Sequence, residues 1–197
     1  LGAAGGAGDD RVAGVYQGSW QTGEDLRFPG GRVRDTGYQT QQHGLQAGFS
    51  TPAGLWSADA RWTRTREAGT PALPMDMIKD DGWLVGARHA GDYGFGLVEG
   101  RVYHHEIEHL MDNYSLRPAA GARMNSPATS DDTGFSLGSH LPRGRHTWGV
   151  GTDFHANAFD AYQQNVGTGA RQDTLNDANR QRLGLYTEWQ AGWSDRW

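Results

Sequence analysis

The stretch LWSADARWTRTR, residues 55–66, alternates apolar and polar side chains with a period of two residues. Successive side chains of a β-strand point to opposite faces of the sheet, so this pattern predicts a strand with one apolar and one polar face. The two alternating sets are Trp56, Ala58, Ala60 and Trp62 on one side and Ser57, Asp59, Arg61 and Thr63 on the other. A strand of this kind separates an apolar from a polar environment.

The same alternation recurs along the chain in about eight segments, which is typical of a transmembrane β-barrel. The expected strands are Arg11–Gln21, Asp35–Ser50, Leu55–Arg66, Asp81–His89, Gly94–Met111, Asp132–Leu141, His146–Asn157 and Arg180–Ala191. Residues 1–10 are rich in Gly and Ala and end in Gly8-Asp9-Asp10, which has the composition of a turn. Aromatic residues near several strand ends fit the aromatic girdles at the two membrane interfaces. The pattern therefore predicts an all-β, antiparallel, up-and-down transmembrane barrel.

The connections between the expected strands alternate in length. Those near residues 52, 92 and 143 are short, whereas those near residues 28, 73, 120 and 169 are long. Outer-membrane barrels have short turns on the periplasmic side and long loops outside, which is the asymmetry seen here.

Composition excludes several other classes of protein. The 197 residues carry a net charge of −5, which does not favour a nucleic-acid partner, and they include no cysteine. No run approaches the ~18 apolar residues of a transmembrane helix. Enzyme motifs such as G-x-S-x-G, a phosphate-binding loop or H-E-x-x-H are absent from the sequence, so we do not expect an enzyme.

A candidate metal site lies in VYHHEIEHLMDNYSLRP, residues 102–118. In an extended strand His109 and Met111 share a face with Glu99 and Arg101, and charged residues in mid-strand cannot face lipid cheaply. This face should therefore line the barrel interior. An imidazole and a thioether two residues apart, about 6.6–7 Å along the strand, could converge on one ion. Thioethers are poor ligands for hard cations and good ones for copper.

Four further residues are auxiliary candidates for metal binding. Met75 and Met77 fall in an expected loop over residues 67–80, and Met124 falls in another over residues 112–131. They could form a low-affinity methionine relay, although methionines in loops more often serve packing. His105 shares the expected interior face with His109.

Three stretches resemble the barrel of TonB-dependent outer-membrane receptors, most closely the copper-receptor branch. They are PALPMDMIKDD (71–81), HLMDNYSLRP (109–118) and RMNSPATSDDTGFSLG (123–138). The resemblance implies a barrel of about 22 strands with an N-terminal plug domain. Residues 1–197 would be one part of that barrel domain, and the plug and the remaining strands would lie outside this chain.

The same resemblance implies copper uptake across the outer membrane of a Gram-negative bacterium, driven by the TonB complex through the plug. The partners would be the lipid bilayer, that complex and a copper ion as Cu(I) or Cu(II). His109 and Met111 match the family's H-x-M motif, which binds copper together with a Cys-x-x-x-Met motif in the plug. That second motif has no counterpart here, because the chain contains no cysteine.

Two alternatives remain open at this point. The cargo could be an iron–siderophore carried by a receptor of the same fold. Alternatively the chain could form a closed eight-stranded structural or adhesion barrel, whose interior would be filled by side chains. Pairing between the first and last strands would favour the small barrel, whereas two open edges would need further strands, because an unpaired edge cannot lie in lipid.

Overall fold

The structure is a computed structural model that describes residues 1–192 and is all-β, with no helix among those residues. The strands are β1 (Gly2–Gly8), β2 (Val12–Gly23), β3 (Arg27–Phe28), β4 (Gly31–Arg32), β5 (Tyr38–Thr51), β6 (Gly54–Ala68), β7 (Asp76–Asp92), β8 (Leu97–Asp112), β9 (Met124–Arg143), β10 (His146–Asn165) and β11 (Arg171–Ala191). Accordingly, no helix in this part of the chain is suited to crossing a membrane.

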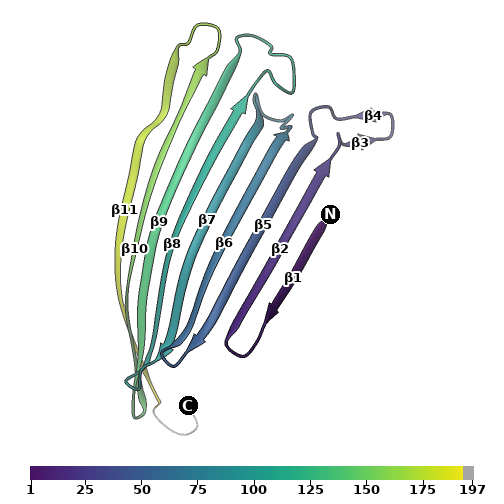
Figure 1. The fold of residues 1–197 in the computed structure, drawn as a ribbon. Coiled ribbons are helices and arrows are strands. Elements are labelled where there is room, and N and C mark those ends of the chain that lie inside the picture. The colour runs from purple at the N-terminus through teal and green to yellow at the C-terminus, as the bar shows by residue number, and fades with distance from the viewer. Residues whose placement is uncertain (193–197) are drawn as a thin grey trace.

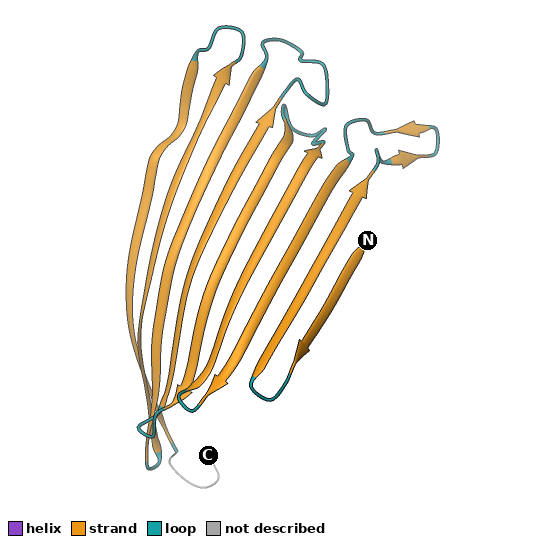
Figure 2. Cartoon of the chain, viewed as in Figure 1, coloured by secondary structure: helices purple, strands orange, loops and turns teal. Residues whose placement is uncertain are grey.

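Nine of these strands form one antiparallel meander (Figures 1 and 2). The order across the sheet is β1-β2-β5-β6-β7-β8-β9-β10-β11, and β3 and β4 form a separate two-stranded hairpin. Each strand between β1 and β11 therefore pairs with the strand before it and the strand after it in the sheet. This is the up-and-down arrangement that the sequence predicted.

The alternation of short and long connections is confirmed. Short turns over residues 9–11, 52–53, 93–96 and 144–145 lie at one end of the sheet, at the bottom of Figure 1. The longer connections over residues 24–37, 69–75, 113–123 and 166–170 lie at the other end. We call these the turn end and the loop end.

The expected number and length of the strands need correction. The main sheet has nine strands instead of about eight, because Gly2–Gly8, which was not expected to be a strand, pairs with β2 from Gly2 opposite Ser19 to Gly8 opposite Ala13. The expected turn follows it at residues 9–11. Four strands also extend at least five residues further toward the loop end than expected, namely β7, β9, β10 and β11. Backbone pairing continues there although the side-chain alternation fades, as is expected where both faces of a strand meet the same surroundings.

One face of the sheet, the apolar face, carries large hydrophobic side chains that are exposed. Leu185 is 80% exposed, and the members of this face include Val12, Leu45, Phe49, Trp56, Val85, Val102, Phe135, Leu137, Trp148, Leu183 and Trp189. Aromatic rings touch across strands near the turn end, as in the pairs Phe49–Trp56 and Trp148–Trp189. The register from β6 to β10 confirms that Trp56 and Trp148 lie on one face, as the alternation predicted.

The sheet has almost no hydrophobic core. Ala161 is the only buried hydrophobic residue among those described. The accessible surface is 13434 Å², against about 9,200 Å² for a globular monomer of 21.5 kDa. A single layer that leaves its apolar face uncovered needs an apolar surrounding, and lipid would supply one.

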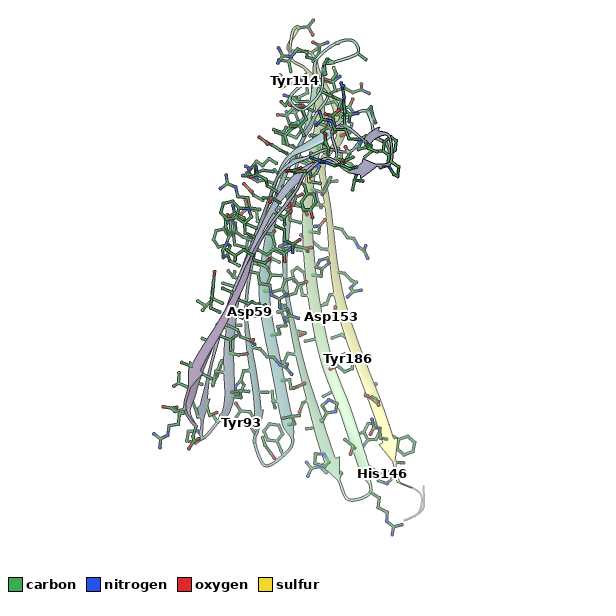
Figure 3. The ribbon with its side chains drawn as sticks, turned by 90° about the vertical axis from the view of Figure 1, so that its right-hand side faces the viewer. Asp59, Tyr93, Tyr114, His146, Asp153 and Tyr186 are labelled. Atoms are coloured by element: carbon green, nitrogen blue, oxygen red, sulfur yellow. The ribbon has the colours of Figure 1, made fainter. Side chains whose placement is uncertain are left out.

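The opposite face, the polar face, carries paired charges. Arg88 of β7 binds Glu99 of β8 at 2.7 Å, and Arg182 of β11 binds Asp153 of β10 at 3.0 Å. Figure 3 shows the curvature of the sheet, with Tyr114 at the loop end, Asp153 near mid-height and His146 at the turn end. The charged mid-strand residues are thus gathered on the face expected to line an interior.

The sheet is open along both of its edges. β1 and β11 lie at opposite ends of the strand order and do not pair with each other within residues 1–192. This arrangement does not match a closed eight-stranded barrel.

We expect the two faces to differ sharply in their tolerance of charge. Leu45→Arg on the apolar face should destabilise the protein by about 2–4 kcal/mol in lipid, the cost of an arginine near the bilayer midplane. Gln46→Arg is the matched control, because Gln46 is the next residue of β5 and lies opposite Asp59 on the polar face. Denaturant unfolding in lipid vesicles measures both, and equal losses would contradict the assignment of the faces.

Candidate metal centre

His109 and Met111 lie near the loop end of β8, on the polar face with Arg101 and Glu99. In the register with β7, His109 is opposite Asp80 and Met111 is opposite Met77. Residues directly opposite each other in adjacent strands share a face, with Cβ atoms about 4.5–5.5 Å apart. The structure therefore brings an imidazole, a carboxylate and two thioethers to one place on the sheet.

Asp80 is in direct contact with His109. Nδ1 of His109 lies 2.8 Å from Oδ2 of Asp80. The two side chains are 27% and 33% exposed, respectively, so the pair is partly shielded from water. A carboxylate in this position fixes the orientation of the imidazole ring.

A third methionine lies on the next strand. Met124 begins β9 two residues before Ser126, the residue opposite Met111, and therefore shares the polar face with it. Met77, Met111 and Met124 thus occupy three adjacent strands at the loop end, and all three side chains are partly buried.

The structure corrects the expected loop positions of two of these methionines. Met77 lies in β7 and Met124 in β9, so only Met75 of the auxiliary methionines is in a loop, residues 69–75. A bulge places Ile78 between the pairs Met77–Met111 and Lys79–Leu110. Strand pairing therefore fixes the positions of Met77 and Met124.

His105 is on the same face but is not part of this cluster. It lies opposite Leu84 of β7 and Asp132 of β9. It is four positions from His109 in the chain, which is about 13 Å along a strand. The neighbouring His104 points to the other face, where its Nδ1 lies 2.9 Å from the hydroxyl of Thr133.

An ion pair between a buried carboxylate and a partly exposed guanidinium connects the two loops next to the methionines. Asp76 is fully buried and binds the guanidinium of Arg117 through two contacts of 2.8 Å. Arg117 also donates hydrogen bonds to the carbonyls of Thr70 and Leu73. Asp76 stands between Met75 and Met77 in the chain, so this ion pair fixes the entry into β7.

The loop after Met111 is closed by its own polar residues. The carboxylate of Asp112 accepts hydrogen bonds from the backbone N–H groups of Tyr114 and Ser115 at 3.0 and 2.8 Å. Asn113 donates to the carbonyl of Ala122 and accepts from the N–H of Met124. The bonds of Asn113 join the two ends of the loop, next to Met111 and Met124.

The donor set of this centre is soft. No group of three or more His, Asp or Glu side chains is arranged to hold a metal ion within residues 1–192. The groups that converge on β7, β8 and β9 are one imidazole, oriented by a carboxylate, and the thioethers. Such a set suits copper better than a hard cation.

Sequence reasoning missed Asp80, which it placed at the end of a loop. The signal that could have found it is the register, because β7 and β8 are joined by a turn over residues 93–96 and pair outward from it. Counting pairs from that turn reaches Asp80 opposite His109.

The buried carboxylate of Asp76 gives a prediction about the loops. Arg117→Met should leave that carboxylate without a cationic partner, with only the hydrogen bonds from Thr70, and destabilise the loop end by about 3–5 kcal/mol, the cost of breaking a buried ion pair from one side. Arg27→Met is the control, because Arg27 and Glu24 are 78% and 85% exposed. Hydrogen exchange in residues 69–75 and 113–123 measures the effect, and unchanged protection would contradict it.

Comparison with known proteins adds one similarity of fold. No family model matches the chain, and no curated protein matches it in sequence. Its structure is similar to that of a protein described as "Copper transporter OprC", with a TM-score of 0.82 over 96% of this chain and 18% sequence identity. The chain spans 32% of the length of that transporter chain. The all-β sheet described above is thus a fold that it shares with a copper transporter.

Proposed function

We propose that this chain is part of an outer-membrane transport barrel that takes up copper, and that His109 and Met111 bind the ion. The observation that carries the proposal is the placement of Met77 opposite Met111 and of Asp80 opposite His109 on the polar face. That placement gathers soft donors at the end of the sheet where the long loops lie.

The proposed membrane environment is supported by the two faces of the sheet. The exposed apolar face would contact lipid, and the ion-paired polar face would line the interior. In lipid the unpaired backbone groups along β1 and β11 would each cost several kcal/mol. We therefore propose that further strands complete the barrel, to about 22 as in the TonB-dependent receptors that the sequence resembles.

Transport driven by the TonB complex through a plug domain is part of this proposal and rests on the sequence resemblance. The long loops would face the exterior of a Gram-negative cell, because barrels of this class keep their short turns on the periplasmic side. The similarity in fold to a copper transporter supports a role in transport.

The choice of copper over a siderophore rests on the side chains at the loop end. A siderophore is held by many aromatic and polar contacts with the barrel interior. The residues that converge here are His109 and three methionines, which suit a bare soft ion. Met75, Met77, Met124 and His105 remain auxiliary candidates; pairing brings Met77 and Met124, but not His105, close to Met111.

We expect His109→Ala and Met111→Ala each to weaken copper binding by more than about 100-fold, because outer-shell partners alone contribute about 10–100-fold. Titrations of the purified protein with Cu(I) under anaerobic conditions and with Cu(II) measure this. His104→Ala is the matched control on the same strand and the opposite face. Unchanged copper binding in both site variants would reject copper as the cargo, and binding of an iron–siderophore by those variants would favour the alternative.

Met77 gives a separate prediction, because it lies opposite Met111. Met77→Leu keeps the volume of the side chain but removes the sulfur, and should weaken Cu(I) binding by about tenfold, or 1.4 kcal/mol. Met75→Leu is the control in the adjoining loop and should change the affinity less. An equal effect of the two substitutions would argue against a specific contribution from Met77.

A further inference from the structure

We infer that Asp80 is a positioning residue for copper: its carboxylate holds the imidazole of His109 in the tautomer that leaves Nε2 free to bind the ion. This inference rests on the proposed role of His109 as a ligand. It assigns to Asp80, a residue outside the H-x-M motif, the role of keeping Nε2 of His109 available for the ion.

The contact between the two residues defines which nitrogen carries the proton. Nδ1 of His109 faces Oδ2 of Asp80 at 2.8 Å. An ionised carboxylate only accepts hydrogen bonds, so Nδ1 must donate. In a neutral imidazole the other nitrogen then has a free lone pair, which is what a metal requires. Asp80 therefore selects the Nδ1–H tautomer.

Other histidines of the sheet are held differently. His155 contacts Asp132 through Nε2, so the same kind of pair engages the opposite nitrogen there. His104 has Nδ1 against Thr133 and Nε2 at 3.7 Å from Asp131. His109 alone of these three combines a carboxylate at Nδ1 with an Nε2 that has no protein partner within residues 1–192.

Backbone pairing between β7 and β8 places Asp80 and His109 side by side. Asp80 and His109 are directly paired residues of β7 and β8, and the ladder continues beyond them from Gly82–Ile107 to Asp92–Leu97. The carboxylate is therefore in place before any ion arrives. Carboxylates that orient metal-binding histidines in this way typically contribute about 10–100-fold to metal affinity.

The test uses the full-length protein, purified in detergent with ¹⁵N-labelled histidine, and copper ions alone as the probe. The ¹⁵N spectrum of the metal-free protein reports the tautomer of each ring, and the signals of His109 are those that His109→Gln removes. We expect Nδ1–H in the wild type and a shift toward Nε2–H in Asp80→Ala. A wild-type ring that is Nε2–H would overturn the inference without any copper measurement.

Copper titrations give the second readout. Asp80→Ala should weaken Cu(I) binding by about 10–100-fold. Asp80→Asn, which keeps an oxygen acceptor, should recover part of the affinity and retain the Nδ1–H tautomer. Asp153→Asn is the control, because it removes a carboxylate of the same face that binds Arg182 instead of a histidine.

The outcomes separate this inference from the proposed function. Loss of copper binding in His109→Ala, with Asp80→Ala within twofold of the wild type, would reject the role of Asp80 and leave the ligand intact. Unchanged binding in His109→Ala would reject the copper site itself, and the role of Asp80 with it. If Asp80→Ala does not fold, the tautomer of His109 in the wild type still tests the inference, because an Nε2–H ring there would overturn it.

Discussion

The register between β7 and β8 is the constraint on which the rest of the site depends. Side chains alternate between faces with a period of two, so a slip of one residue would move His109 and Met111 from the polar to the apolar face. Ion pairs at the loop end oppose such a slip. Asp81 of β7 accepts two hydrogen bonds from Arg66 of β6, and Lys79 of β7 contacts Glu108 of β8. The same strands that form the site are thus tied together beside it.

Sequence predicted the faces of the sheet well and the strand ends poorly, for one physical reason. Ala58, Ala60 and Trp62 alternate with polar residues of β6 because the two faces of the sheet meet different surroundings. Toward the loop end Met77 and Met124 sit among polar and charged neighbours, where side chains no longer separate into two kinds. Only backbone pairing shows that they belong to strands.

The motif HLMDNYSLRP, on which the sequence resemblance rests, contains two kinds of residue. His109 and Met111 point onto the polar face, whereas Asp112, Asn113 and Arg117 close and anchor the loop that follows. A short motif shared with a receptor family therefore contains loop-building residues as well as candidate ligands. The sequence alone could not tell them apart, because Asp and Asn are themselves common metal ligands.

The position of the site within the sheet explains why its geometry does not depend on the edges. β7, β8 and β9 each pair on both sides with described strands, and at least two strands separate them from either edge. Whatever completes the hydrogen bonding of β1 and β11 therefore acts far from Asp80, His109 and Met77. A sheet holds its central strands through paired backbone on both sides, so these side chains are arranged in advance of binding. Ion binding therefore does not have to order these side chains, so little of the binding free energy is lost as conformational entropy.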